Sequence, residues 1–361
     1  MTQTIMLYCA VLSLCFFLAK KARKNEKKIN IVIIVFLLTM LAGMRKYTVG
    51  IDTGTYVYYL DLIRNGQFND VWGVERTFKI IMLLLSRLSG GYTLFLTAMA
   101  LITNACIVIR FWDFRDIAKF EWMLLAYYIM FYFYGYNIMR QMCAVAIVFW
   151  SSRYIEKENY LSFLMGIAIA YFFHTSAILG LCYLLAEFVN WRYLDIRKKR
   201  VIRASMLLFP VGAVYAVRIL FSYLGYFSNL KIRLGPILFA KLMFFLISQY
   251  GLKNSIVYRE EKKQQTGDRD AAINICYKIQ SIEICYLAGL LLAFLGYANQ
   301  TISRGSLYLY IMECVYMGIL MQYKKISSIY PLLVFLLYSY LFVSTLIAGG
   351  QGEIPYLFFW Q

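Results

Sequence analysis

Four polar residues stand where apolar segments of this sequence begin or end, and their side chains can take part in group transfer. Asp52 and His174 can accept a proton from a hydroxyl group. Arg140 and Arg304 can bind a phosphate, because a planar guanidinium forms paired, charge-assisted hydrogen bonds. The chain contains a single histidine. These four residues are therefore the candidate catalytic residues.

The segment 44–59 surrounds Asp52 with further polar residues. It contains Arg45, Thr53, Tyr56 and glycines at positions 50 and 54. The glycines allow a tight turn, and the Asp52 carboxylate can accept a hydrogen bond from a substrate hydroxyl. The segment lacks the GK[ST] ending of a nucleotide-binding loop. The alternative is an ordinary loop in which Asp52 pairs with Arg45 or Lys46.

Simpler interpretations also exist for the other three candidates. From the ends of their helices, Arg140 and Arg304 can extend to lipid headgroups, as long basic side chains do at a membrane surface. His174 can be an interfacial histidine whose hydrogen bonds are satisfied locally, although it is the residue best suited to proton exchange near neutral pH. The sequence alone leaves both interpretations open.

The composition places these residues in a membrane protein. Of the 361 residues, 61% are hydrophobic and 16% are charged, far from the balance of a soluble domain. The excess of Lys and Arg behind the net charge of +18 lies in short loops between apolar runs, as in the cytoplasmic loops of a membrane protein. The positive charge is therefore explained by membrane topology, and we expect no nucleic-acid partner. The scattered cysteines and the single histidine predict neither disulfides nor a metal site, and no cofactor is expected.

The apolar runs predict an all-α, polytopic protein with a single transmembrane domain over residues 1–361. A span needs about 20 apolar residues. The segment 77–88 is short and contains Lys79 and Arg87, so we expect an interfacial or re-entrant helix there, within an outer loop over 45–90. The twelve expected spans are 4–19, 29–44, 91–110, 120–136, 138–153, 159–173, 175–191, 204–224, 235–251, 274–297, 305–322 and 327–346.

The distribution of Lys and Arg predicts the orientation of these spans. The loop after the first span, the loop 110–119, the segment 192–203 and the loop 252–272 are rich in basic residues and should be cytoplasmic. Both termini and the segment 44–59 then lie outside. This topology brings six residues to the outer face: Arg45, Asp52, Arg76, Arg140, His174 and Arg304. Lys241 lies inside an expected span and could face a cavity, and Arg218, Lys231 and Arg233 are weaker candidates near it.

Several of these motifs, in this order, resemble the EpsG family of Wzy-like bacterial polysaccharide polymerases. The family pattern has an arginine and G-x-D-T-x-x-Y after the second span, then N-x-x-R-Q-x-x-A, then F-H-x-S-A, and a late outer arginine followed by tyrosines. One departure is the segment 74–78, where the family often has an acidic-Pro-Gly-like sequence, so the roles of Glu75 and Arg76 are undefined. The matching residues are Arg45, Gly50, Asp52, Thr53, Tyr56, Asn137, Arg140, Gln141, Ala144, Phe173, His174, Ser176, Ala177 and Arg304.

The resemblance implies a GT-C-like glycosyltransferase architecture in the plasma membrane, with the active site facing outside. It implies transfer of a glycan from undecaprenyl pyrophosphate to a second lipid-linked repeat unit of exopolysaccharide, capsule or O-antigen, with a chain-length regulator as a further partner. Arginines would stabilise the leaving pyrophosphate in place of a metal, and His174 or Asp52 would act as the base. The expected substrate-binding residues are Arg45, Gly50, Thr53, Tyr56, Arg76, Asn137, Gln141, Ser176 and Tyr308.

Two other functions fit parts of the sequence. A lipid-linked oligosaccharide flippase would need cationic residues along a cavity at both leaflets, and the inner halves of the spans hold few isolated charges. A membrane O-acyltransferase would use a lone intramembrane histidine, but it would need access to acyl-CoA from the cytoplasm. The expected position of His174 outside argues against that reaction.

Overall fold

The computed structural model describes residues 2–88, 90–189, 269–295, 300–322, 329–349 and 351–361, together with six positions between 238 and 248. Within these ranges the chain is helical, apart from turns and one isolated β-bridge between Arg45 and Phe358. It divides into two compact units, which we describe separately. The first unit comprises Met1–Ile178 with Ser328–Gln361, and the second comprises Leu179–Ser327.

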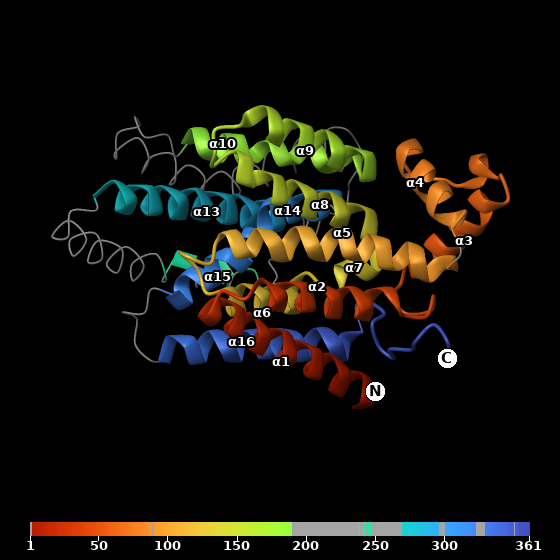
Figure 1. Cartoon of the computed structure of the whole chain (residues 1–361), viewed down its shortest axis with the longest axis horizontal. Coiled ribbons are helices and arrows are strands. Elements are labelled where there is room, and N and C mark those ends of the chain that lie inside the picture. The colour runs from red at the N-terminus through yellow and green to blue at the C-terminus, as the bar shows by residue number, and fades with distance from the viewer. Residues whose placement is uncertain are drawn as a thin grey trace, which may run out of the picture. The chain divides into compact units, whose positions relative to one another are not determined.

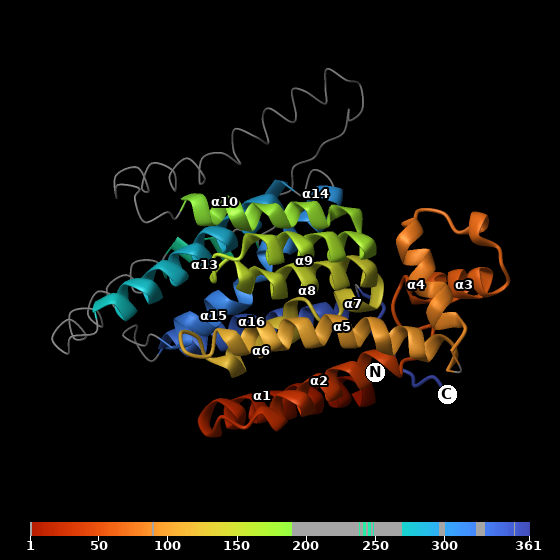
Figure 2. The same ribbon diagram turned by 45° about the horizontal axis from the view of Figure 1, so that its top comes forward.

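The first unit is a helical bundle. Figure 2 shows α1, α2, α5, α8 and α9 lying side by side in this order, and all neighbours in this row are antiparallel except α5 and α8, which run in the same direction. α1 also packs on α6, and α16 packs on α6. Its elements (Figure 1) are α1 (Thr2–Asn25), α2 (Lys28–Gly43), α3 (Thr53–Arg64), η1 (Phe68–Asp70), α4 (Arg76–Ser86), α5 (Gly91–Asp113), α6 (Phe120–Met130), α7 (Tyr134–Asn137), α8 (Met139–Ser151), η2 (Ser152–Tyr154), α9 (Tyr160–Phe173) and α16 (Ile329–Ala348).

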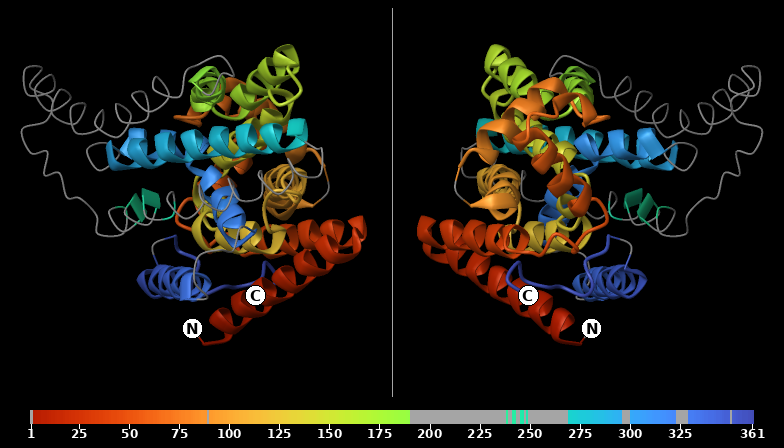
Figure 3. Two further views of the ribbon diagram at one scale, coloured as in Figure 1. Left: turned by 90° about the vertical axis from the view of Figure 1, so that its left-hand side faces the viewer. Right: turned by 90° about the vertical axis from the view of Figure 1, so that its right-hand side faces the viewer.

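The long helices of the first unit run between two ends that differ in composition. One, called here the Arg140 end, contains residues 44–52, 73–77, 134–140, 172–176 and 351–361. The other, called the Arg110 end, contains residues 20–28, 110–119 and 152–159. Both chain termini lie toward the Arg140 end (Figure 1) and near each other (Figure 3). The Tyr356 amide donates to Thr4 Oγ1 there over 3.1 Å. The expected arrangement, with both termini on the side of segment 44–59, agrees with these contacts.

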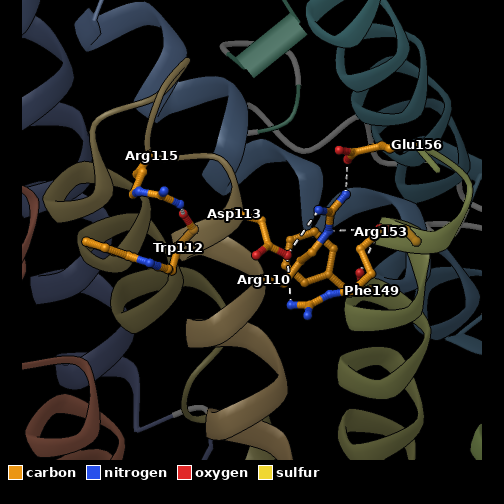
Figure 4. A network of polar contacts seen from close by, with 8 residues as sticks. Arg110, Trp112, Asp113, Arg115, Phe149, Arg153 and Glu156 are labelled. Carbon is orange, nitrogen blue, oxygen red and sulfur yellow. Dashed lines mark hydrogen bonds and ion pairs between the residues drawn. The ribbon is translucent and has the colours of Figure 1, made fainter. Parts of the chain in front are cut away.

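The Arg110 end is held by ion pairs between the basic loops and a few acids (Figure 4). Buried Arg110 pairs with Glu156 and with Asp113, the latter at 3.3 Å, and its Nε donates to Ser152 Oγ over 3.1 Å. Arg153 lies 2.7 Å from the same Asp113 carboxylate. In addition, Arg23 makes a two-pronged bond to Glu121, at 2.9 and 2.8 Å. The loops at 20–28, 110–119 and 152–159 thus share one end, as the charge pattern predicts.

The Arg140 end begins where α2 ends, and aromatic and basic side chains satisfy the last carbonyls of that helix. The final turn of a helix leaves carbonyl groups without intrahelical partners. Here the Leu41 carbonyl accepts from the Tyr356 hydroxyl at 2.9 Å and the Tyr136 hydroxyl at 3.5 Å, and the Ala42 carbonyl accepts from Arg45 Nη1. A cation at a helix C-terminus is also favoured by the helix dipole. Arg45 is therefore built into the end of α2.

The C-terminal tail, residues 351–361, runs across the segment 44–50 and holds it in place. The Asn137 Nδ2 group also donates to the Gln351 carbonyl over 2.9 Å. The tail thereby joins the first loop to the start of the α7–α8 segment. Its backbone bonds to the loop are Lys46 N to Leu357 O (2.8 Å), Gly50 N to Gly352 O (2.8 Å) and Phe359 N to Met44 O (2.9 Å).

α3 and α4 form an excursion at the Arg140 end, beyond the long helices (Figure 1). α4 has 11 residues, which at about 1.5 Å per residue span roughly half of the ~30 Å hydrocarbon layer. It packs on α3, α5 and α9, and Thr77 Oγ1 donates to the Phe172 carbonyl over 2.8 Å. A short helix thus lies where one was expected, at 77–88, and its interfacial or re-entrant placement stays a prediction.

The expected spans match the helices of the first unit in position, but several are short or broken. Three described helices are long and apolar enough to cross a membrane: Thr2–Asn25, Gly91–Asp113 and Tyr277–Phe294. The total of twelve spans and the GT-C-like architecture therefore stay predictions. The expected span 120–136 is divided into α6 and α7, and the hydroxyl of Tyr132 between them donates to the Leu38 carbonyl of α2 over 2.7 Å. The span 204–224 and most of 235–251 lie outside the described residues.

The second unit contains one long α-helix and three shorter ones in its described part. α13 packs on α14, α15 and α10. The expected span 305–322 is divided at Ile311, between α14 and α15. The elements are α10 (Cys182–Val189), α13 (Arg269–Leu295), α14 (Gln300–Tyr310) and α15 (Met312–Gln322); η3 (Thr175–Leu181) crosses from the first unit into the second.

Lys241 is part of a buried polar cluster in the second unit. Its Nζ lies 2.8 Å from Glu313 Oε1 and 2.8 Å from the Tyr310 hydroxyl. The Lys241 and Glu313 side chains are 2% and 0% exposed. Two opposite charges thus compensate each other in the protein interior, which is the usual arrangement for ionisable groups at membrane depth. Lys241 thus forms a buried ion pair with Glu313. From the sequence, its side chain was a candidate to face a cavity.

Loss of one partner of this pair should destabilise the protein strongly. Lys241→Met leaves the Glu313 carboxylate buried without its counter-charge, and we expect a cost of about 3–5 kcal/mol. The double variant Lys241→Met with Glu313→Leu removes both charges and should recover most of the loss. The measurement is the thermal unfolding midpoint of the full-length protein in detergent. Equal midpoints for the single and double variants would contradict a coupled pair.

Candidate functional site

Arg140 is the centre of the polar site at the Arg140 end. It lies in the first turn of α8, and its guanidinium forms an ion pair with Glu75. Its Nη2 donates to the Gly73 carbonyl over 3.0 Å, and its Nε donates to the Tyr56 hydroxyl over 3.3 Å. The Arg140 and Glu75 side chains are each 15% exposed. The guanidinium is thus held from three directions, and the side chain stays partly exposed to solvent.

Aromatic rings line the guanidinium of Arg140. Its central carbon lies 5.9 Å from the Tyr56 ring centre and 5.8 Å from the Phe78 ring centre, within the range of cation–π attraction. Burial raises the pKa of the Tyr56 hydroxyl, and the neighbouring Arg140 opposes that rise. Because the hydroxyl stays protonated at neutral pH and accepts from Arg140, its own proton can be donated to a ligand.

His174 ends α9 and is connected to the Arg140 site through the next residue. The Thr175 amide donates to Glu75 Oε1 over 3.2 Å. The His174 Nδ1 atom receives a hydrogen bond from the Ser176 amide at 3.2 Å and contacts Ser176 Oγ at 2.6 Å. A backbone amide can only donate, so Nδ1 carries a lone pair and the ring proton lies on Nε2. In this geometry His174 presents an N–H donor.

Asp52 stands at the head of α3, one turn before Tyr56. Its amide donates to Asn137 Oδ1 over 3.3 Å, and its carbonyl accepts from the Tyr56 amide. The carboxylate is half-buried and makes no hydrogen bond or ion pair within the described part of the chain. The alternative in which Asp52 pairs with Arg45 or Lys46 is therefore wrong. The Asp52 side chain is held by its backbone and keeps its acceptor capacity.

Arg45, Gly50 and Thr53 support this segment from inside. The Arg45 side chain is buried over the Tyr136 ring, 4.4 Å from its centre, and donates to the Val49 carbonyl. Thr53 Oγ1 donates to the Tyr136 carbonyl over 2.9 Å. Gly50 has a φ of +96°, and a side chain there would meet Thr53 and Tyr136. We therefore assign these three expected substrate-binding residues a positioning role.

The other expected binding residues have different surroundings. Arg76 is exposed at the start of α4, Gln141 is buried in α8, and Ser176 contacts His174. Asn137 connects the Asp52 amide to Gln351. The expected convergence of Arg76 on the site stays a prediction.

Arg304 and Tyr308 belong to α14 of the second unit. The Arg304 side chain is exposed, whereas Tyr308 is buried and its carbonyl accepts from the Tyr183 hydroxyl over 2.7 Å. The convergence of Arg304 with Arg140 and His174 stays a prediction, since the two residues that would meet it lie in the first unit.

Sequence reasoning missed Glu75 and the Thr175 amide as parts of the site. The only signal was an acidic residue directly before the helix 76–86, at a position that departs from the family pattern. Among the described residues, no group of three or more His, Cys, Asp or Glu side chains could hold a metal ion.

A comparison with protein-family models settles the relationship of the chain. The EpsG family model matches residues 28–358, which is nearly the whole sequence. The chain belongs to the EpsG family. Members of the EpsG family are glycosyltransferase-type polysaccharide polymerases, and the apolar helices fit a membrane protein of this kind. No curated protein matches the chain, and neither does any solved structure. The G-x-D-T-x-x-Y, N-x-x-R-Q and F-H-x-S segments, on which the resemblance to the EpsG family rests, all lie at the Arg140 end.

Proposed function

We propose that this chain polymerises the repeat units of a bacterial surface polysaccharide at the outer leaflet of the plasma membrane. A glycan leaves its undecaprenyl pyrophosphate and is transferred to a hydroxyl of a second lipid-linked repeat unit. The observation that carries the proposal is the assembly around Arg140. Residues from α3, the segment before α4, α8 and the end of α9 contact one another there. Each of these segments contains, or in the case of residues 73–75 adjoins, a family motif.

The reaction breaks the bond between the anomeric carbon and the pyrophosphate oxygen, and the electron pair leaves with the pyrophosphate. A guanidinium at this oxygen stabilises the developing charge, and stabilisation of this kind is usually the largest catalytic contribution. Arg140 is placed for it because its partly exposed guanidinium lies beside two aromatic rings and the Tyr56 hydroxyl.

The acceptor hydroxyl loses its proton as its oxygen bonds to the anomeric carbon. Asp52 and His174 were equal candidates for this base. The tautomer of His174 presents an N–H group, whereas the Asp52 carboxylate has unused lone pairs. We therefore assign Asp52 as the base and His174 as a hydrogen-bond donor to the substrate.

Reconstitution tests the function directly. Purified full-length protein in lipid vesicles, supplied with lipid-linked single repeat units, should produce a ladder of longer glycans and release lipid pyrophosphate. We expect the same ladder in the presence of EDTA, because guanidinium groups replace the metal. A flippase would move the units across the bilayer without lengthening them, and an acyltransferase would require acyl-CoA. Absence of any ladder from vesicles that contain correctly folded protein would overturn the proposal.

A further inference from the structure

Glu75 contacts its partners in the manner of a bound phosphate. One carboxylate oxygen pairs with Arg140 Nη1, and the other accepts from the Thr175 amide over 3.2 Å. A phosphate group also presents oxygens to a guanidinium and to a backbone amide in this way. The protein thus places an anion of its own between the two donors that a pyrophosphate would use.

A pyrophosphate that approaches Arg140 meets acceptors that are already bound there. The Glu75 carboxylate, the Gly73 carbonyl and the Tyr56 hydroxyl take three of the five guanidinium N–H donors, one on each nitrogen. Of these partners, only Glu75 carries a charge. A phosphate bound beside the undisturbed Glu75 carboxylate would suffer like-charge repulsion in a partly buried site. The carboxylate is therefore the group that has to move.

The backbone before Glu75 allows this movement. Gly73 has a φ of +67°, and no atom lies within 4 Å of the place where its side chain would be. Trp72 is 79% exposed. Glu75 itself precedes α4 in an extended conformation and makes no side-chain cap to that helix. Apart from the side-chain bonds of Glu75 and the hydrogen bond from Arg140 to the Gly73 carbonyl, few contacts therefore connect the segment 72–75 to the rest of the unit.

We propose that Glu75 is a resident anion that holds Arg140 and the Thr175 amide in their binding geometry and gives way to the pyrophosphate of the substrate. The inference rests on the proposed function and names a specificity residue for it. Because the ligand has to outcompete a carboxylate, a pyrophosphate is favoured over a lipid phosphate of lower charge. The empty site stays closed to weaker anions.

Ligand binding to the full-length protein in detergent tests this role. The probes are farnesyl pyrophosphate and farnesyl phosphate, with tryptophan fluorescence as the readout. Removal of a competing closed state tightens apparent binding, so Glu75→Gln should bind both probes about tenfold more tightly and discriminate less between them. Arg140→Gln should bind neither probe. Asp70→Asn is the matched control, since it removes a negative charge from an exposed position of the same loop and should leave binding unchanged.

Two outcomes overturn the inference while leaving the polymerase proposal intact. Unchanged or weaker probe binding by Glu75→Gln, in a protein that still forms the polymer ladder, would make Glu75 a support for Arg140. If Asp70→Asn tightened probe binding as much as Glu75→Gln, the gain would come from the loss of any nearby negative charge and not from the position of Glu75. If Glu75→Gln fails to fold, Glu75→Ser removes the same charge with a smaller side chain and has the same expected result. Loss of the ladder in wild-type vesicles, in contrast, concerns the proposed function and not Glu75.

Discussion

Arg140→Lys is expected to reduce polymer synthesis at least about a hundredfold, although the positive charge is retained. The three nitrogens of Arg140 bond in fixed directions to Glu75, Gly73 and Tyr56. A lysine ammonium is a point charge on a flexible chain and cannot reproduce this planar fork. The remaining charge would therefore sit in a different place relative to the leaving pyrophosphate. The measurement is the initial rate of ladder formation in reconstituted vesicles.

The control for this variant is Arg64→Lys. Arg64 lies at the exposed end of α3 in the same loop, so the exchange tests the chemical change without touching the site. We expect wild-type rates for Arg64→Lys and the same unfolding midpoint for both variants. A wild-type rate for Arg140→Lys would show that charge alone is sufficient at this position and would remove the argument for paired phosphate contacts.

Asp52→Asn should lower the turnover rate by about 10²–10⁴, the usual contribution of a general base. Its effect on stability should be small, because the bonds that hold Asp52 come from its backbone amide and carbonyl. The amide side chain has the same shape as the carboxylate but cannot take the proton of the acceptor. The drop should therefore appear in kcat, while binding of the pyrophosphate probe stays as in the wild type.

His174→Asn separates the two candidate bases. The Asn Oδ1 atom can take over the hydrogen bond from the Ser176 amide that Nδ1 now accepts, so the local turn is preserved while the Nε2 donor is lost. His174 is assigned a neutral hydrogen bond to the substrate, which contributes about 0.5–1.5 kcal/mol, so its loss should cost about tenfold in rate at most, less than Asp52→Asn. If His174→Asn has the larger effect on kcat, the roles of the two residues are reversed.

The sequence predicted the ends of the bundle better than the chemistry of its side chains. The alternation of apolar runs and basic loops placed Arg140, His174 and Asp52 on one side, because Lys and Arg concentrate at the opposite end around Arg110 and Arg153. The apolar length of each run and the Lys and Arg content of each loop can be read from short stretches of sequence, without knowledge of the folded structure. A separate short helix at 77–88 followed from the same argument, and α4 forms there; its interfacial placement stays a prediction.

The roles of Arg45 and Glu75 depend on the folded structure and could not be predicted in this way. Arg45 looked like a substrate ligand, but the end of α2 turns its guanidinium inward onto the ring of Tyr136. Glu75 is far from Arg140 in the sequence and reaches it only because α4 folds back against α9. The break between α6 and α7 was equally hidden, since its tyrosines bond to carbonyl groups of a different helix.

The segment 351–361 influences Asp52 without contacting its side chain. Its backbone bonds to the loop 44–50, and through Gln351 it holds the Asn137 side chain that accepts a hydrogen bond from the Asp52 amide. A change in this segment therefore reaches the assigned base through Asn137. The position of the base thus depends on a part of the chain that is more than 200 residues away in the sequence.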